Sequence, residues 1–101
     1  MIKHIVWWTL KPEADGHTAQ ENAARIKKMG EALNGRIPGL LSLEITSTFL
    51  PSTTVAPQLL LFSAHPDEAA LKAYAQHPLH LELGALIKAC TASREAIDYV
   101  I

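Results

Sequence analysis

The segment from Ala73 to His80, which reads AYAQHPLH, carries the residue types best suited to chemistry. It places Tyr74, His77 and His80 within seven residues of one another. An imidazole with a pKa near ~6.5 can accept a proton at neutral pH. A phenol hydroxyl group can donate a hydrogen bond to a carbonyl or enolate oxygen. This segment is therefore the best local candidate for a site.

Pro78 stands between the two histidines, at a point where a helical pattern must break because proline lacks the backbone N–H group. Tyr74 and His80 are six residues apart, which is beyond one continuous helical face. A change of direction at Pro78 would turn both rings into one cavity, where His80 acts as the base and Tyr74 polarises a carbonyl group. The alternative is that both are structural, with His80 bonded to a backbone carbonyl group and Tyr74 filling the space between helix and sheet.

Four further side chains are candidates for the same pocket. His4 shares a predicted strand face with Trp8, and it points toward Tyr74 if that face meets the helices. Otherwise His4 is a core histidine, and Trp8 belongs to the core or a dimer interface. His65 follows a predicted strand, where it is exposed or joins the pocket. His77 is expected to cap or stabilise the turn before Pro78.

Metal binding has weak support in the sequence. His77 and His80 form a possible pair at three-residue spacing, but Pro78 distorts it and no cysteine or acidic residue adjoins it. We expect no metal site and no cofactor. The single cysteine, Cys90, lies on an apolar helical face and is predicted to be a buried, inert thiol. Arg94 and Asp98 share a strand face and are expected to pair at the surface.

Composition limits the class of protein. The chain has 101 residues, enough for one domain spanning residues 1–101, with 49% apolar and 19% charged residues. Such apolar excess predicts that a second copy of the chain covers part of the surface. The net charge of −1, without a basic cluster, argues against nucleic acid or an anionic membrane as partner. The absence of a disulfide pair, of a long apolar run and of a signal-peptide pattern favours a cytoplasmic protein.

Hydrophobic periodicity divides the chain into strands and helices. Strands are predicted over 2–10, 41–48, 58–64 and 93–100, and helices from near 19 to a stop at 34–35, from 66–68 to Pro78, and from 79–80 to about 89. The helix from 19 begins with a capping box of Thr18 and Glu21. Periodicity alone leaves 58–64 open to a helical reading, but its shortness and Pro57 favour a strand.

The predicted order is that of a ferredoxin-like α+β fold, βαββαβ, with a four-stranded antiparallel sheet and the helices on one face. The other face carries Ile5 and Trp7. Burying apolar surface contributes ~25 cal/mol of stabilisation per Å². Covering this face with a second copy can therefore offset the free-energy cost of association, which is roughly 4–15 kcal/mol. We therefore expect a homodimer packed sheet to sheet.

Several segments in order resemble the stress-responsive A/B barrel (Dabb) family. They are IKHIV at 2–6, IPGL at 37–40, ALKAY at 70–74, HPLH at 77–80 and Asp98-Tyr99. The resemblance covers nearly the whole chain. It implies a dimeric α/β barrel in which two ferredoxin-like sheets pack face to face.

The resemblance also implies candidate chemistry. A plant member, an olivetolic acid cyclase, closes a linear polyketide thioester by intramolecular aldol condensation without a cofactor, and its motif is Tyr-x-x-His-Pro-x-His. That motif implies a catalytic pair of Tyr74 and His80, and its first histidine corresponds to His77. A further histidine near the start of the first strand of the cyclase corresponds to His4. Three hypotheses follow: a barrel that binds a hydrophobic small molecule, a cofactor-independent cyclase or lyase, and a structural or protein-interaction module.

Overall fold

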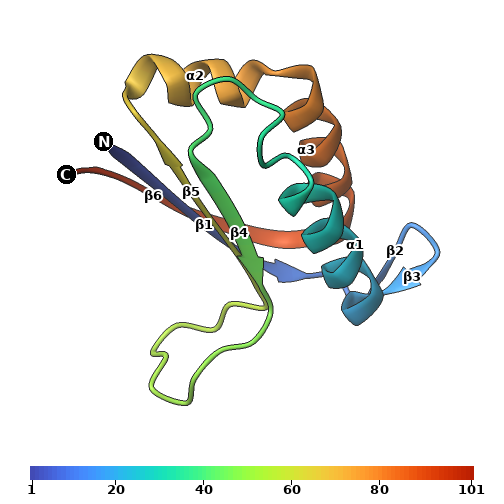
Figure 1. The fold of residues 1–101 in the computed structure, drawn as a ribbon. Coiled ribbons are helices and arrows are strands. Elements are labelled where there is room, and N and C mark those ends of the chain that lie inside the picture. The colour runs from blue at the N-terminus through green and yellow to red at the C-terminus, as the bar shows by residue number, and fades with distance from the viewer.

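A computed structural model describes residues 1–101 as one sheet with helices on a single face (Figure 1). The sheet is antiparallel, has four strands and runs in the order β4-β5-β1-β6. The elements are β1 (Ile2–Leu10), β2 (Glu13–Ala14), β3 (His17–Thr18), α1 (Ala19–Glu31), β4 (Ser42–Thr46), β5 (Leu59–His65), α2 (Glu68–Gln76), α3 (Pro78–Cys90) and β6 (Thr91–Val100). This is the predicted ferredoxin-like α+β fold, and β5 is a strand as expected.

The helix α1 begins as predicted but ends earlier. The Thr18 hydroxyl group accepts from the N–H of Glu21, whose carboxylate accepts from the Thr18 N–H, so the capping box is present. The last helical residue is Glu31, not the Asn34-Gly35 stop. Asn34 instead bonds to both backbone groups of Leu43, which ties the turn after α1 to β4.

The sequence analysis missed a short hairpin between β1 and α1. The strands β2 and β3 pair through a turn at Asp15 (φ 54°) and Gly16 (φ 77°). Asp-Gly is a preferred pair for a type I′ hairpin turn, since both residues tolerate positive φ. The signal was therefore present at residues 15–16.

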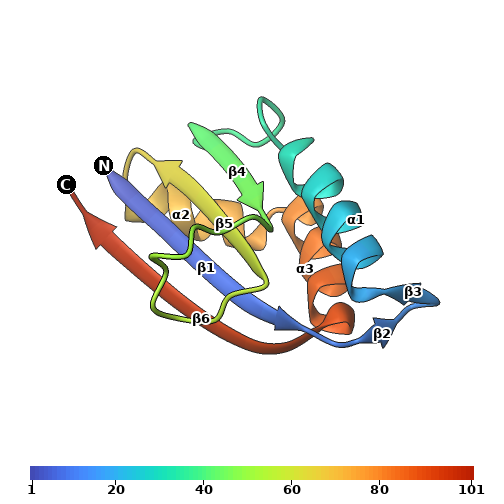
Figure 2. The ribbon, with the colours of Figure 1, turned by 90° about the horizontal axis from the view of Figure 1, so that it is seen from below.

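The core lies between the sheet and the helices. Figure 2, seen from below, shows α1 and α3 side by side. The face of β1 that carries Val6 and Trp8 is buried against this layer, and Ile26 of α1 and Leu83 of α3 are fully buried. His4 lies two residues before Val6 on β1, so its side chain is on the same face of the strand and points toward the helices. This orientation was the condition for placing His4 near Tyr74.

The opposite side of the sheet has no helix over it. We call it the open face. It carries apolar side chains from three strands that are half-buried or exposed: Ile5, Trp7, Leu60, Phe62, Ile97 and Tyr99. The loop after β4 projects away from the helices (Figure 1), and Leu50 and Val55 in it are exposed.

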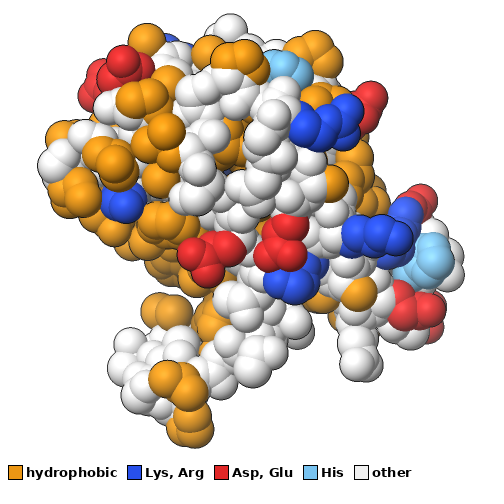
Figure 3. Space-filling view, in the orientation of Figure 1, with side chains coloured by type: hydrophobic (Ala, Val, Ile, Leu, Met, Phe, Trp, Pro, Cys, Tyr) orange, Lys and Arg blue, Asp and Glu red, His pale blue; other side chains and the backbone are white.

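In Figure 3 apolar side chains gather over the left half of the body and on the projecting loop, whereas most of the lysine and arginine side chains lie on the right, on the side of α1 and α3. None of the three helices combines the length and the apolar character that crossing a membrane requires.

Candidate functional site

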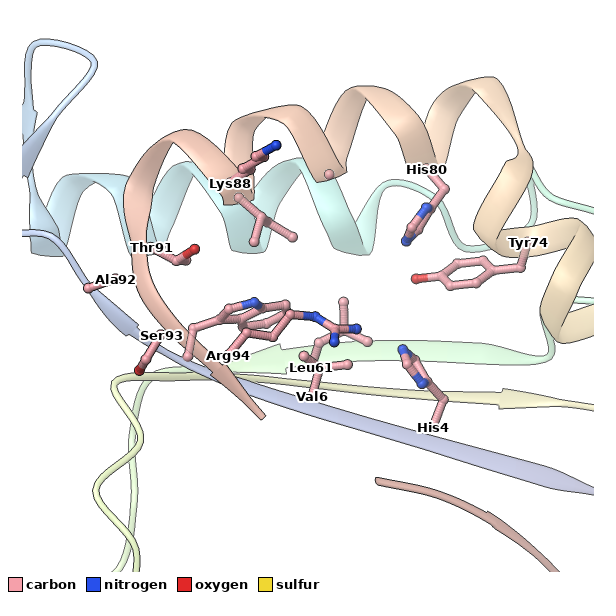
Figure 4. Close-up of a pocket in the computed structure, with 13 residues that line it drawn as sticks. His4, Val6, Leu61, Tyr74, His80, Lys88, Thr91, Ala92, Ser93 and Arg94 are labelled. Atoms are coloured by element: carbon pink, nitrogen blue, oxygen red, sulfur yellow. The ribbon is translucent and has the colours of Figure 1, made fainter. Parts of the chain in front are cut away.

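A cavity of about 440 Å³ lies between α3 and the sheet (Figure 4). Its volume falls in the range typical of small-molecule sites. The lining residues are His4, Val6, Trp8, Leu61, Tyr74, His80, Gly84, Ile87, Lys88, Thr91, Ala92, Ser93 and Arg94. Four of the six residues expected in a pocket (His4, Trp8, Tyr74 and His80) are among them, whereas His65 and His77 are not.

The break between α2 and α3 brings the rings of Tyr74 and His80 together. His77 has an extended backbone, caps both helices, and accepts a hydrogen bond at Nδ1 from the Leu79 N–H (3.1 Å). Pro78 is the first residue of α3, where its missing N–H costs nothing, so α3 begins one or two residues before the predicted start. The Tyr74 and His80 ring centroids are 4.4 Å apart.

The hydrogen bonding of His80 determines its tautomer. Its Nδ1 lies 3.1 Å from the carbonyl oxygen of Ala75. A carbonyl oxygen only accepts, so Nδ1 carries the proton and the neutral ring keeps its lone pair on Nε2. Burial lowers the pKa of His80 below its usual value, which favours this neutral form at neutral pH. His80 is thus equipped to act as a base through Nε2.

Tyr74 is buried, with 1% of its surface exposed, yet its hydroxyl group has no hydrogen-bond partner within the chain. Figure 4 shows this group pointing into the cavity between His80 above and His4 below. Burial raises the pKa of Tyr74 to about 12, and the nearby Ser63 hydroxyl group opposes this shift without reaching hydrogen-bonding geometry. The phenol is therefore protonated and offers an unused donor to the cavity.

His4 is held by an acidic residue that the sequence analysis assigned elsewhere. Its Nδ1 bonds to the Asp98 carboxylate, across the antiparallel pairing of β1 with β6. Asp98 therefore does not pair with Arg94, and the predicted Arg94–Asp98 pair is wrong. A carboxylate accepts, so the Nδ1 of His4 donates this hydrogen bond, which fixes the orientation of the ring.

His65 is buried rather than exposed, and the exposed interpretation is wrong. It is the last residue of β5, and its ring lies 4.8 Å from that of Tyr74. Its Nε2 is 2.9 Å from the Ser63 hydroxyl oxygen, while Nδ1 has no partner. Burial lowers the pKa of His65. The residue supports Tyr74 from outside the cavity.

Trp8 and Cys90 complete the set of candidates. Trp8 is buried in the cavity wall, and its indole Nε1–H has no partner. Cys90 is buried in the core, as predicted. No three histidine, cysteine or acidic side chains are grouped closely enough to hold a metal ion.

The arrangement combines hydrogen-bond donors with a neutral base. The Tyr74 hydroxyl group can hold a carbonyl oxygen, and it strengthens that bond as negative charge develops on the oxygen. The lone pair on His80 Nε2 can take a proton from an adjacent carbon. These groups suit a carbonyl compound, and the apolar wall suits a hydrocarbon body.

The fold and cavity define a ferredoxin-like α+β domain, and the sequence specifies its family. The chain belongs to the stress responsive A/B barrel domain (Dabb) family, whose profile matches residues 2–101. Among curated proteins, no sequence matches this chain.

Solved structures with this fold cover almost the whole chain. A dimeric ferredoxin-like protein of unknown function from Bacteroides fragilis is 25% identical, with a TM-score of 0.84 over 99% of this chain and 95% of that chain. A dimeric ferredoxin-like protein from Thermobifida fusca is 21% identical, with a TM-score of 0.81 over 99% and 90%. A hydroxynitrile lyase from Passiflora edulis is 17% identical, with a TM-score of 0.78 over 99% and 92%.

Proposed function

We propose that this protein is a homodimeric barrel that binds a small, largely apolar carbonyl compound in the cavity beside Tyr74. The observation that carries the proposal is the buried Tyr74 hydroxyl group, which has no partner within the chain and faces the cavity. Leaving a buried donor unpaired costs roughly 1–3 kcal/mol. A ligand oxygen that accepts from this hydroxyl group removes the penalty.

The cavity wall supports an apolar ligand body. Val6, Leu61 and Ile87 line it between the polar side chains. Binding sites for small molecules combine such apolar walls with a few placed polar groups. The third hypothesis, a purely structural module, does not account for a cavity of this size beside an unpaired donor.

The homodimer rests on the open face. Ile97 and Tyr99 on β6 are 49% and 40% exposed, and Ile97 lies directly opposite Ile5 of β1. The projecting loop extends on this same side of the sheet. The B. fragilis and T. fusca relatives are dimeric. A second copy packed on the open face buries these side chains and leaves the cavity on the helix side intact.

A second candidate function is proton-transfer catalysis without a cofactor. The His80 tautomer favours it, because Nε2 is unprotonated beside the Tyr74 hydroxyl group. His80 removes a proton from the carbon next to a carbonyl group, and Tyr74 stabilises the enolate oxygen. The enolate carbon then attacks a second carbonyl carbon of the same molecule, and the new alkoxide takes up a proton. These steps are an intramolecular aldol addition, with His80 returning the proton that it removed, and subsequent loss of water from the product completes an aldol condensation of the polyketide-cyclase type.

Ligand binding is tested with 4-phenylbutan-2-one and its hydrocarbon analogue butylbenzene, by NMR titration of the labelled protein. We expect the ketone to bind more tightly than the hydrocarbon, and Tyr74→Phe to abolish the difference. Tyr99→Phe, an exposed tyrosine on the open face, is the matched control. Equal binding of both compounds by the wild type would refute the role of Tyr74.

Catalysis is tested by the exchange of the α-protons of the same ketone for deuterium in D₂O, followed by NMR. We expect the wild-type protein to accelerate exchange, and His80→Gln to lose the acceleration while remaining folded. His17→Gln, on the β2–β3 hairpin away from the cavity, should exchange at the wild-type rate. Undiminished exchange by His80→Gln would remove His80 as the base.

A further inference from the structure

Arg94 gives the cavity a positive charge that no acidic residue of the chain balances. It lies on β6 opposite Trp8 and therefore on the helix-facing side of the sheet. Figure 4 shows its guanidinium group beside Leu61 and Val6, between Ser93 and His4. It takes part in no ion pair or side-chain hydrogen bond, whereas Arg25 pairs with Asp15.

The acidic side chains nearest in sequence to Arg94 are unavailable to it. Asp98, four residues along the same strand face, is bound to His4. Glu95 is the next residue on the strand, so it points to the opposite face. The cavity lining contains no aspartate or glutamate, but it contains a second cation, Lys88.

Beside the unprotonated Nε2 of His80, the cavity has two further unused donors. Trp8 Nε1–H and the Tyr74 hydroxyl group are buried and have no partners. Arg94 is close enough to His80 to contribute to the lowered pKa of that imidazole. An occupant rich in acceptors and negatively charged would satisfy all three side chains.

We propose that the natural ligand is a carboxylate, an apolar oxo acid whose anionic group is bound by the Arg94 guanidinium group. The inference deepens the proposed function and rests on it. A single guanidinium group matches the two oxygens of a carboxylate with parallel hydrogen bonds. The apolar wall then holds the hydrocarbon part of the acid, and Tyr74 holds its carbonyl oxygen.

The test compares 4-phenylbutanoate, 4-phenylbutan-1-ol and 4-phenylbutyl phosphate by isothermal titration at low ionic strength. Charge-assisted hydrogen bonds predict that the wild type binds the acid about tenfold to a hundredfold more tightly than the alcohol. Arg94→Gln should bind acid and alcohol equally, and Arg94→Lys should retain part of the preference. Arg36→Gln, an exposed arginine remote from the cavity lining, should keep the full preference.

Each contrary outcome has a distinct meaning. If the alcohol binds as tightly as the acid, the carboxylate assignment is overturned while small-molecule binding stands. A preference that persists in Arg94→Gln overturns the role of Arg94, and tighter binding of the phosphate overturns the choice of carboxylate. If none of these compounds binds and the ketone also fails to bind, the proposed function fails together with this inference.

Discussion

Tyr74 and His80 belong to different helices, yet their rings face each other at 4.4 Å across the break at His77-Pro78. On one straight helix, residues six apart would point in different directions. The break therefore creates the site, and the proline that interrupts the helical pattern also starts α3.

Replacing Tyr74 with phenylalanine should raise the stability of the protein while weakening ketone binding. The hydroxyl group is buried without a partner, so removing it relieves a penalty, and we expect the free energy of unfolding to rise by about 1 kcal/mol. Urea denaturation measures the change. Glu82→Gln, at an exposed position of α3 on the helix side of the sheet, should shift it by less than ~0.5 kcal/mol. A clear loss of stability in Tyr74→Phe would show that the hydroxyl group has a partner in the folded protein.

His65 should make the protein less stable in mild acid. Burial lowers its pKa in the folded state, whereas the unfolded chain binds a proton near pH ~6.5. The unfolded state then holds more protons, so stability falls as the pH drops below that value, by up to ~1.4 kcal/mol per pH unit for one group.

The comparison of His65→Phe with the wild type between pH 7 and pH 5 checks this slope. We expect the variant to lose part of the pH dependence, whatever its stability at pH 7, since burial also lowers the pKa of His80. An unchanged slope in His65→Phe would mean that His65 does not titrate below its unfolded value.

The sequence predicted best those features of the structure that depend on residues close together in the chain. The Thr18–Glu21 capping box, the alternating faces of β1 and the helix break at Pro78 are local patterns, and the structure contains all three. The approach of Tyr74 to His80 followed from the break and from the family motif.

The sequence was least informative where partners come from distant strands. The bond between His4 and Asp98 depends on the register of β1 against β6, and the sequence offered Arg94 as a nearer partner for Asp98. His65 was judged by its place at a strand end, but α2 with Tyr74 covers that end. Both errors reflect packing that local patterns do not encode.

A charge on the open face should prevent dimer formation. We expect Ile97→Glu to behave as a monomer in light-scattering measurements where the wild type is a dimer, because the interface would bury an unpaired carboxylate. Leu81→Glu is the control, since Leu81 is 58% exposed on α3, on the helix side of the sheet. A wild-type protein that is itself monomeric, or a dimeric Ile97→Glu, would contradict packing through the open face.

Substitutions at Gly84 test whether the ligand occupies the cavity beside α3. It lies in the middle of α3 and lines the cavity, and a Cβ atom built there meets nothing within 4 Å. Glycine inside a helix costs about 1 kcal/mol relative to alanine. We expect Gly84→Ala to stabilise the protein by about this amount, whereas Gly84→Leu fills the cavity and abolishes ketone binding.

Gly30 provides the contrasting control for the same substitution. A Cβ atom at Gly30 would lie 2.3 Å from Ile45 Cδ1, so α1 or that side chain must shift. Overpacking of a core typically costs ~1–3 kcal/mol, which offsets the gain in helix propensity from alanine. We therefore expect Gly30→Ala to leave the free energy of unfolding unchanged or lower it. If Gly84→Leu binds the ketone as well as the wild type does, the ligand does not occupy the cavity beside α3.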